Sequence, residues 1–128
     1  MTVWSPVQII VPGTIDPIAV QWGSSINGAK FGDTFTPIIS ASLVDHSIQV
    51  EGLFGSGTSV TLQGSNDATS TTTGNYHALT DPFSNTIAMG SAQIRQTTEV
   101  TSWIKPAVTA GDGNESLIIT VAFRRSVR

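Results

Sequence analysis

Apolar and polar residues alternate along two neighbouring stretches in the middle of the chain. Residues 47–54 read SIQVEGLF, so that isoleucine, valine and glycine occupy every second position. Residues 58–63 alternate in the same way, and the Gly-Ser-Gly sequence at 55–57 supplies turn residues between the two runs. A period of two is typical of β-strands with one buried face. We therefore predict a β-hairpin here, with residues 76–79 returning as a further strand beside it.

The clearest strand pattern lies near the C-terminal end. Leu117, Ile119, Val121 and Phe123 fall on one face of residues 116–123. Shorter apolar runs are separated by turn residues, and no stretch sustains a helical period over three or four turns. Many short strands at regular spacing indicate an all-β fold, an antiparallel β-sandwich that we expect to be jelly-roll-like. These shorter runs lie at residues 7–11, 18–22, 31–39, 86–89, 93–100 and 103–108.

Two prolines bracket the first apolar run of the chain. Pro6 and Pro12 enclose residues 7–11, and proline cannot donate a hydrogen bond to a β-ladder. This predicts a sheet edge or a strand end rather than a central strand. We expect residues 1–24 to form an extended N-terminal segment, or arm, and residues 25–128 to form a single β-sandwich domain.

Composition narrows the classes of function. Charged residues make up 12% of the 128 residues, against about 25% in an average soluble protein. A net charge of −3 argues against a nucleic-acid binder, which normally carries a basic face. The absence of cysteine excludes disulfides, thiol nucleophiles and Cys-ligated zinc. No apolar run approaches the length of a membrane span, and the N-terminal residues lack the pattern of a signal peptide, so no membrane partner is expected.

Few residues suggest chemistry. His46 and His77 are the two histidines available for acid–base catalysis near neutral pH, and no nucleophile-elbow sequence accompanies them. Asp67, Asp112 and Glu115 carry carboxylates in predicted loops, where calcium ligands can gather. The 112–115 sequence lacks the ligand spacing of an EF-hand, and turn formation explains its Asp-Gly-Asn composition. We therefore expect no enzyme activity, no metal and no cofactor.

Aromatic and basic residues near the chain ends are candidates for a partner interface. Trp103 lies beside an apolar neighbour, which favours core packing. For Trp4 and Trp22, core packing and anchoring on a neighbouring subunit both remain open, since aromatic residues are enriched at interface hot spots. The basic C-terminal residues are either a solvated end or a match for an acidic partner surface. The candidate interface residues are Trp4, Ile9, Ile10, Val11, Trp22, Arg124 and Arg125.

Two groups of sequence features carry a resemblance to a known class of protein. The first is SVTLQGSND at 59–67, followed by YHAL at 76–79. The second is TSWIKP at 101–106, a GDGN loop at 111–114 and the terminal hydrophobic strand. Over residues 47–125 the chain resembles the small β-sandwich head proteins of tailed bacteriophages, which act as capsid cement or decoration proteins. The resemblance implies a structural virion protein on the outer capsid surface that binds the major capsid protein, commonly as a homotrimer, without an active site.

A second resemblance implies a different function. The Ser-Asn-Asp turn at 65–67, with an aromatic residue nearby, is similar to discoidin-like and other galactose-binding sandwich domains. In those domains the pattern continues with glycine and tryptophan, whereas here Asp67 is followed by alanine and a Ser/Thr tract, and the aromatic residue is Tyr76. This alternative implies a carbohydrate-binding module of a phage tail fibre or adhesin. It predicts exposed aromatic side chains beside the loops at 66–76 and 112–115.

Overall fold

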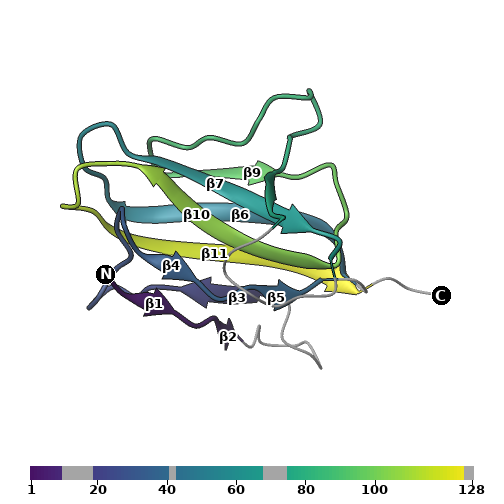
Figure 1. The fold of residues 1–128 in the computed structure, drawn as a ribbon, viewed down its shortest axis with the longest axis horizontal. Coiled ribbons are helices and arrows are strands. Elements are labelled where there is room, and N and C mark those ends of the chain that lie inside the picture. Colours follow the sequence, from purple (N-terminus) through teal and green to yellow (C-terminus); the bar gives the residue numbers. More distant parts are fainter. Residues whose placement is uncertain (10–18, 41–42, 68–74, 126–128) are drawn as a thin grey trace.

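The computed structural model describes residues 1–9, 19–40, 43–67 and 75–125, and Figure 1 shows their course. All regular secondary structure in this part of the chain consists of β-strands, which confirms the all-β prediction. The described residues contain no helix with the length and apolar character of a membrane span. Antiparallel pairing dominates, and the arrangement is consistent with a β-sandwich.

The strands of the described residues form three sheets. The largest has the order β2 (Val7–Ile9), β3 (Ala19–Trp22), β11 (Ser116–Arg125), β6 (Leu43–Leu53) and β9 (Gln93–Gln96), and every neighbouring pair in it is antiparallel. The second has the antiparallel order β5 (Ile38–Ile39), β10 (Trp103–Ala110), β7 (Ser59–Ser65) and β8 (His77–Ala78). The smallest pairs β1 (Val3–Trp4) with β4 (Thr34–Phe35) in parallel.

One hydrophobic core joins the two larger sheets. Alternation along β6 and β11 buries one face of the five-stranded sheet, and alternation along β7 and β10 buries one face of the four-stranded sheet. In Figure 1, β7 and β10 pass in front of β6. Full burial of an aliphatic side chain contributes about 1.5–3 kcal/mol, so this cluster is the main source of stability. It includes Ile48, Val50, Val60, Leu62, Ile104, Val108, Leu117, Ile119 and Val121.

The predicted hairpin is wrong, because its two strands belong to different sheets. β6 pairs with β11 and β9, whereas β7 pairs with β10 and β8. The glycine-rich link at 54–58 therefore carries the chain from one sheet to the other across the core. The same alternation suits both arrangements, since each strand turns its apolar face inward either way. The predicted return strand is confirmed, because β8 lies beside β7.

The N-terminal segment is part of the sheets. β3 lies inside the five-stranded sheet, between β2 and β11, and β1 pairs with β4. The predicted division between an arm at 1–24 and a domain at 25–128 therefore does not separate residues 1–9 and 19–24 from the rest. The apolar alternation of β3 explains the difference, since Val20 and Trp22 enter the common core. The edge prediction is confirmed for β2, which is the outermost strand of its sheet.

Candidate functional site

The outer face of the five-stranded sheet presents a row of uncharged side chains. Residues Val7, Gln21, Thr120, Gln49 and Ile94 lie directly opposite one another on five consecutive strands. Residues paired in this way share one face of a sheet. The Nε2 of Gln21 donates to the Oγ1 of Thr120 at 3.3 Å, which is consistent with this shared face. The row ends in two exposed aliphatic side chains, because Val7 is 66% and Ile94 62% exposed.

Little charge surrounds this row. In the neighbouring position on β6, Glu51 accepts a hydrogen bond from the Nε2 of Gln49 at 3.0 Å, and its pair on β11 is Ile118. At the far end of the sheet, Arg124 pairs with Asp45, so these two opposite charges offset each other. A nearly neutral sheet face is suited to contact with another protein, since charged residues are depleted at interface cores.

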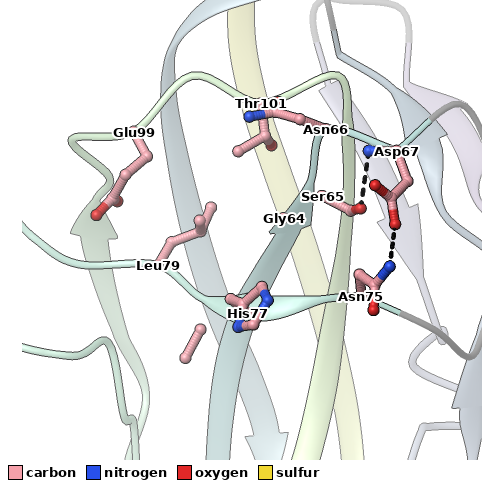
Figure 2. Close-up of a pocket in the computed structure, with 10 residues that line it drawn as sticks. Gly64, Ser65, Asn66, Asp67, Asn75, His77, Leu79, Glu99 and Thr101 are labelled. Atoms are coloured by element: carbon pink, nitrogen blue, oxygen red, sulfur yellow. Dashed lines mark hydrogen bonds between the residues drawn. The ribbon is translucent and has the colours of Figure 1, made fainter.

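A polar pocket of about 400 Å³ lies at the end of β7 and beside β8, and Figure 2 shows the residues around it. Its polar walls come from the Ser-Asn-Asp turn at 65–67 and from Asn75, His77, Glu99 and Thr101. The Oγ of Ser65 accepts a hydrogen bond from the backbone N–H of Asp67 at 3.2 Å. The Asp67 carboxylate in turn accepts one from the side chain of Asn75. These bonds fix the orientation of the pocket's acidic wall.

Carboxylates on two walls give the pocket an acidic character. Glu99 accepts the backbone N–H of Thr80 at 2.8 Å and also its hydroxyl. Burial by itself would raise the pKa of Glu99, but the two bonds from Thr80 hold it below its usual range. His77 lines the same pocket, yet no hydrogen bond in Figure 2 joins its ring to a carboxylate. The described residues therefore show no histidine activated by an acidic partner at this site.

Tyr76 does not line this pocket. The Nζ of Lys105 lies 5.0 Å from the centre of the Tyr76 ring, and the buried Tyr76 hydroxyl has no hydrogen-bond partner among the described residues. Burial raises the pKa of Tyr76 and lowers the pKa of Lys105. The alternative hypothesis expected exposed aromatic residues beside two loops. Next to the 112–115 loop there is Phe31, which is partly exposed and donates its N–H to Glu115 at 3.1 Å.

The two loops of that hypothesis lie at opposite ends of β7. The 66–76 loop follows the strand, whereas the 112–115 loop contacts the link that precedes it, because Asp112 accepts the N–H of Ser56 at 2.9 Å. The described residues of these two loops therefore do not form one binding site. The turn interpretation of residues 112–115 is confirmed, since Asp112 also accepts the N–H of Asn114 at 2.9 Å.

Glu115 is a buried carboxylate that joins the 112–115 loop to the link before β7 through hydrogen bonds. It is 4% exposed and accepts hydrogen bonds from the N–H groups of Phe31, Asp112 and Gly113 and from the hydroxyl of Thr58. Burial by itself would raise the pKa of Glu115, but these donors outweigh it and hold the pKa below its usual range. Across the described residues, no group of three or more acidic or histidine side chains is arranged to hold a metal ion.

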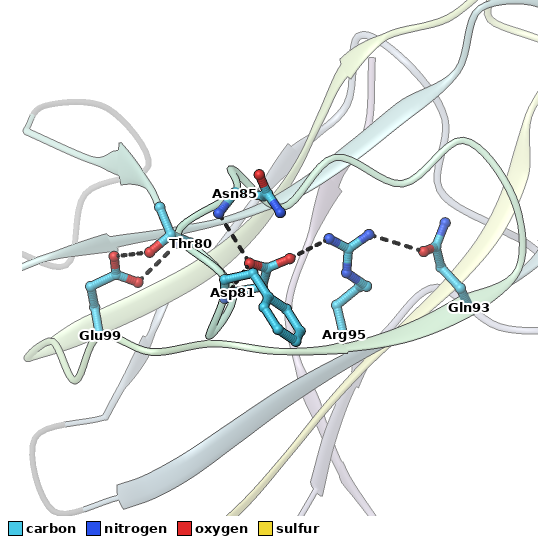
Figure 3. Close-up of polar contacts among 7 residues, drawn as sticks. Thr80, Asp81, Asn85, Gln93, Arg95 and Glu99 are labelled. Atoms are coloured by element: carbon cyan, nitrogen blue, oxygen red, sulfur yellow. Dashed lines mark hydrogen bonds and ion pairs between the residues drawn. The ribbon is translucent and has the colours of Figure 1, made fainter.

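A second polar cluster lies beside the edge strand β9, and Figure 3 shows it. The Nη2 of Arg95 lies 2.5 Å from the Oδ2 of Asp81. The other oxygen of Asp81 accepts the N–H groups of Phe83 and Asn85 at 2.9 and 3.0 Å. The bond from Arg95, followed by these backbone bonds, lowers the pKa of Asp81. The cluster fixes the turn at 81–85 against β9.

The predicted interface residues are divided among different environments. Trp22 is completely buried in the core and donates its indole N–H to the carbonyl of Thr36 at 3.1 Å, so the interface interpretation is corrected to core packing. Trp4 packs against the same core and donates its indole N–H to Asp33 at 2.8 Å. Ile9 lies half-buried on the edge strand β2.

The remaining predicted residues lie near the two chain ends. Arg124 is exposed and paired with Asp45, and Arg125 ends β11. Ile10 and Val11 lie outside the described residues. The partner contacts of Ile9, Trp4 and Arg124 stay predictions. His46 is almost completely buried, and its ring forms a T-shaped contact with the ring of Phe123 at a centroid distance of 6.5 Å, so it does not face an open site.

Sequence reasoning missed the neutral row and the Arg95–Asp81 cluster. The row depends on register across five strands, and only the single-strand alternation is visible in the sequence. Aspartate before proline, as at Asp81, is typical of a turn, but nothing local connects it with a residue 14 positions away. Comparison of the chain with protein-family models, curated proteins and solved structures finds no significant match. The resemblance to phage head proteins therefore stays a hypothesis.

Proposed function

We propose that this protein is a structural component of a tailed-phage head, a cement or decoration protein with a jelly-roll-like sandwich. In this role it binds the outer capsid surface and joins neighbouring major capsid subunits, as a homotrimer. The proposal combines the sequence resemblance over residues 47–125 with one structural observation, the neutral row on the outer face of the five-stranded sheet.

The neutral row supports contact with a broad protein surface. Its five side chains span all five strands and carry no charge. Standard protein interfaces bury about 800 Å² on each partner, and a sheet face that spans five strands offers an extended area. Its central residue, Thr120, is flanked by Gln21 and Gln49, which can donate and accept hydrogen bonds at the interface.

Co-sedimentation with purified, expanded and undecorated capsids tests the proposal. Thr120→Arg places a charge at the centre of the row, and we expect it to weaken binding at least about tenfold, because a buried unpaired charge is costly. Ser56→Arg adds the same charge at the exposed turn before β7, so it serves as the matched control. Wild type and Ser56→Arg should sediment with the capsids.

Two results would count against this function. Wild-type protein that stays in the supernatant would remove the capsid as partner. Equal binding of the capsid by Thr120→Arg and Ser56→Arg would exclude the neutral row as the contact face. Light scattering tests the trimer separately, since a trimer has three times the 13.4 kDa mass of the chain.

The polar pocket favours a second candidate, a carbohydrate-binding module. Its volume of about 400 Å³ lies within the range of about 300–1,000 Å³ for small-molecule sites. Carboxylates on two walls accept hydrogen bonds from hydroxyl groups and repel anions, so the matching ligand is a neutral sugar. Among the described residues, no tyrosine, phenylalanine or tryptophan lines this pocket as an aromatic platform, since Tyr76 lies elsewhere.

A glycan array separates the two candidates. Asp67→Asn removes one acidic wall while preserving the side-chain volume, and Glu51→Gln makes the same change on the outer sheet face. The carbohydrate candidate predicts binding to neutral glycans that Asp67→Asn abolishes and Glu51→Gln preserves. An array without binding, or binding that both variants retain, would exclude the pocket as a sugar site.

A further inference from the structure

The loop that follows β3 contains an asparagine directly before a glycine. Asn27 is the one asparagine of the chain with this neighbour, since Asp, Tyr, Thr and Glu follow the asparagines at 66, 75, 85 and 114. Asn27 is exposed, and no hydrogen bond joins its side-chain amide to another described residue. An exposed Asn-Gly pair can cyclise, because glycine has no Cβ to hinder attack of its backbone nitrogen on the asparagine amide.

Packing against β11 requires glycine at position 28. A Cβ on Gly28 would lie 2.4 Å from the Oγ of Ser116 and 2.6 Å from the backbone nitrogen of Leu117, which is inside van der Waals contact. The next residue, Ala29, exchanges two backbone hydrogen bonds with Leu117 at 2.9 Å, and these hold the loop against the strand. The fold therefore keeps the least hindered neighbour that Asn27 can have.

Ser24 polarises the peptide bond between Asn27 and Gly28. The carbonyl oxygen of Asn27 accepts the backbone N–H of Ser24 at 2.9 Å and the Ser24 hydroxyl at 3.3 Å. The same hydroxyl accepts the N–H of Asn27 at 3.1 Å, which holds it in place. Amide resonance moves the negative charge of a deprotonated peptide nitrogen onto its carbonyl oxygen. Two donors at that oxygen therefore stabilise the anionic Gly28 nitrogen, which is the attacking form.

The one Asp-Gly pair of the chain, which can cyclise in the same way, is held differently. The N–H of Gly113 donates to the Oε1 of Glu115 at 3.1 Å, and the Asp112 carboxylate accepts two backbone N–H groups at 2.9 Å. Both reacting groups of that pair are therefore occupied. By contrast, no described residue accepts a hydrogen bond from the N–H of Gly28.

We propose that Asn27 is a site of spontaneous deamidation, which makes the loop after β3 acidic as the protein ages. The Gly28 nitrogen bonds to the Cγ of Asn27 while the bond from Cγ to Nδ2 breaks, and the proton from the Gly28 nitrogen leaves with Nδ2 as part of ammonia. Water then opens the succinimide ring at either carbonyl, so that aspartate or isoaspartate forms. Each product adds one negative charge to the net charge of −3. The reaction needs water alone and no capsid partner.

Mass spectrometry after incubation in mildly alkaline buffer tests the site. Cleavage after Lys30 separates Asn27 from the other asparagines. The peptide that ends at Lys30 should exchange the mass of an amide NH₂ for that of a hydroxyl, and chromatography should resolve the aspartate and isoaspartate forms. Asn27→Gln keeps a side-chain amide but closes a six-membered ring less readily, so this peptide should stay unchanged over the same period.

A pair of serine variants tests the polarised peptide bond. Ser24→Ala removes the hydroxyl donor at the Asn27 oxygen, and we expect conversion about fivefold slower, the effect of about one hydrogen bond. Ser25→Ala removes the neighbouring exposed hydroxyl, so it is the matched control and should convert like wild type. Thermal unfolding checks that both variants are folded, and the wild-type measurement depends on neither.

The outcomes separate the site from its activation. Conversion that Asn27→Gln abolishes and Ser24→Ala slows would support both. Wild type in which Asn27 stays unchanged, or in which Asp112 or another asparagine is converted faster, would overturn the site. Conversion of Ser24→Ala at the rate of Ser25→Ala, or faster, would overturn the role of the Ser24 hydroxyl.

Discussion

Substitution of Glu115 measures how much one buried carboxylate stabilises the loops to which it is hydrogen-bonded. Glu115→Ala removes the acceptor of four hydrogen bonds with lengths of 2.7–3.1 Å. The buried hydroxyl of Thr58 then loses its acceptor, at a cost of about 1–3 kcal/mol, and the three N–H groups each lose about 0.5 kcal/mol or more. We expect the free energy of unfolding to fall by about 3 kcal/mol.

Glu115→Gln should remove only part of the same stabilisation. One oxygen is kept, whereas the amide NH₂ that replaces the other faces two donors, so two of the four bonds are lost. We expect a decrease of about 2 kcal/mol. Urea unfolding followed by tryptophan fluorescence measures both variants, and Glu51→Gln, an exposed carboxylate on β6, is the control with an expected change within about 0.5 kcal/mol. A loss below about 1 kcal/mol for Glu115→Ala would refute the reasoning.

The pH dependence gives an independent check of Glu115. Its pKa in the folded protein is lowered, so its contribution is fully present above the unfolded value of about 4.3 and is lost as the pH falls through the folded pKa. The amide of Glu115→Gln does not titrate. The difference in unfolding free energy between wild type and Glu115→Gln should therefore shrink below about pH 4. A difference that stays constant with pH would contradict a stabilised carboxylate.

Three further changes test other contacts. Gly111→Ala should destabilise, because its Cβ would lie 2.4 Å from the hydrogen-bonded Oε2 of Glu115, and calorimetry should show a lower melting temperature. Trp22→Ala should cost about 3–5 kcal/mol in urea unfolding through the cavity it leaves, and a loss below about 1 kcal/mol would contradict its core position. Lys105→Met should preserve or raise stability at pH 7, because burial desolvates the ammonium and the described residues place only the Tyr76 ring beside it; a marked loss would show that this ring contact outweighs burial.

The sequence alone determined which segments are extended and which side chains face the core. Alternation marked residues 116–123 as the strongest strand, and four of its apolar residues do line or border the core. The proline bracket at residues 6–12 marked a sheet edge, and the turn composition at 112–115 marked a turn. These features depend on the period of side chains along one strand and on local backbone chemistry, which a single stretch of sequence contains.

Only the tertiary structure decided which strands are neighbours. Residues 47–63 carry the same alternation in a hairpin and in two strands that face each other across a core, so the sheet change at 54–58 was not visible. Trp22 lies in the core because β3 pairs with β2 on one side and with β11 on the other. The neutral row and the Arg95–Asp81 cluster both depend on register between distant segments. Many of these strands could pair with one another at a similar free energy. The packing of the whole core therefore decides which strands become neighbours.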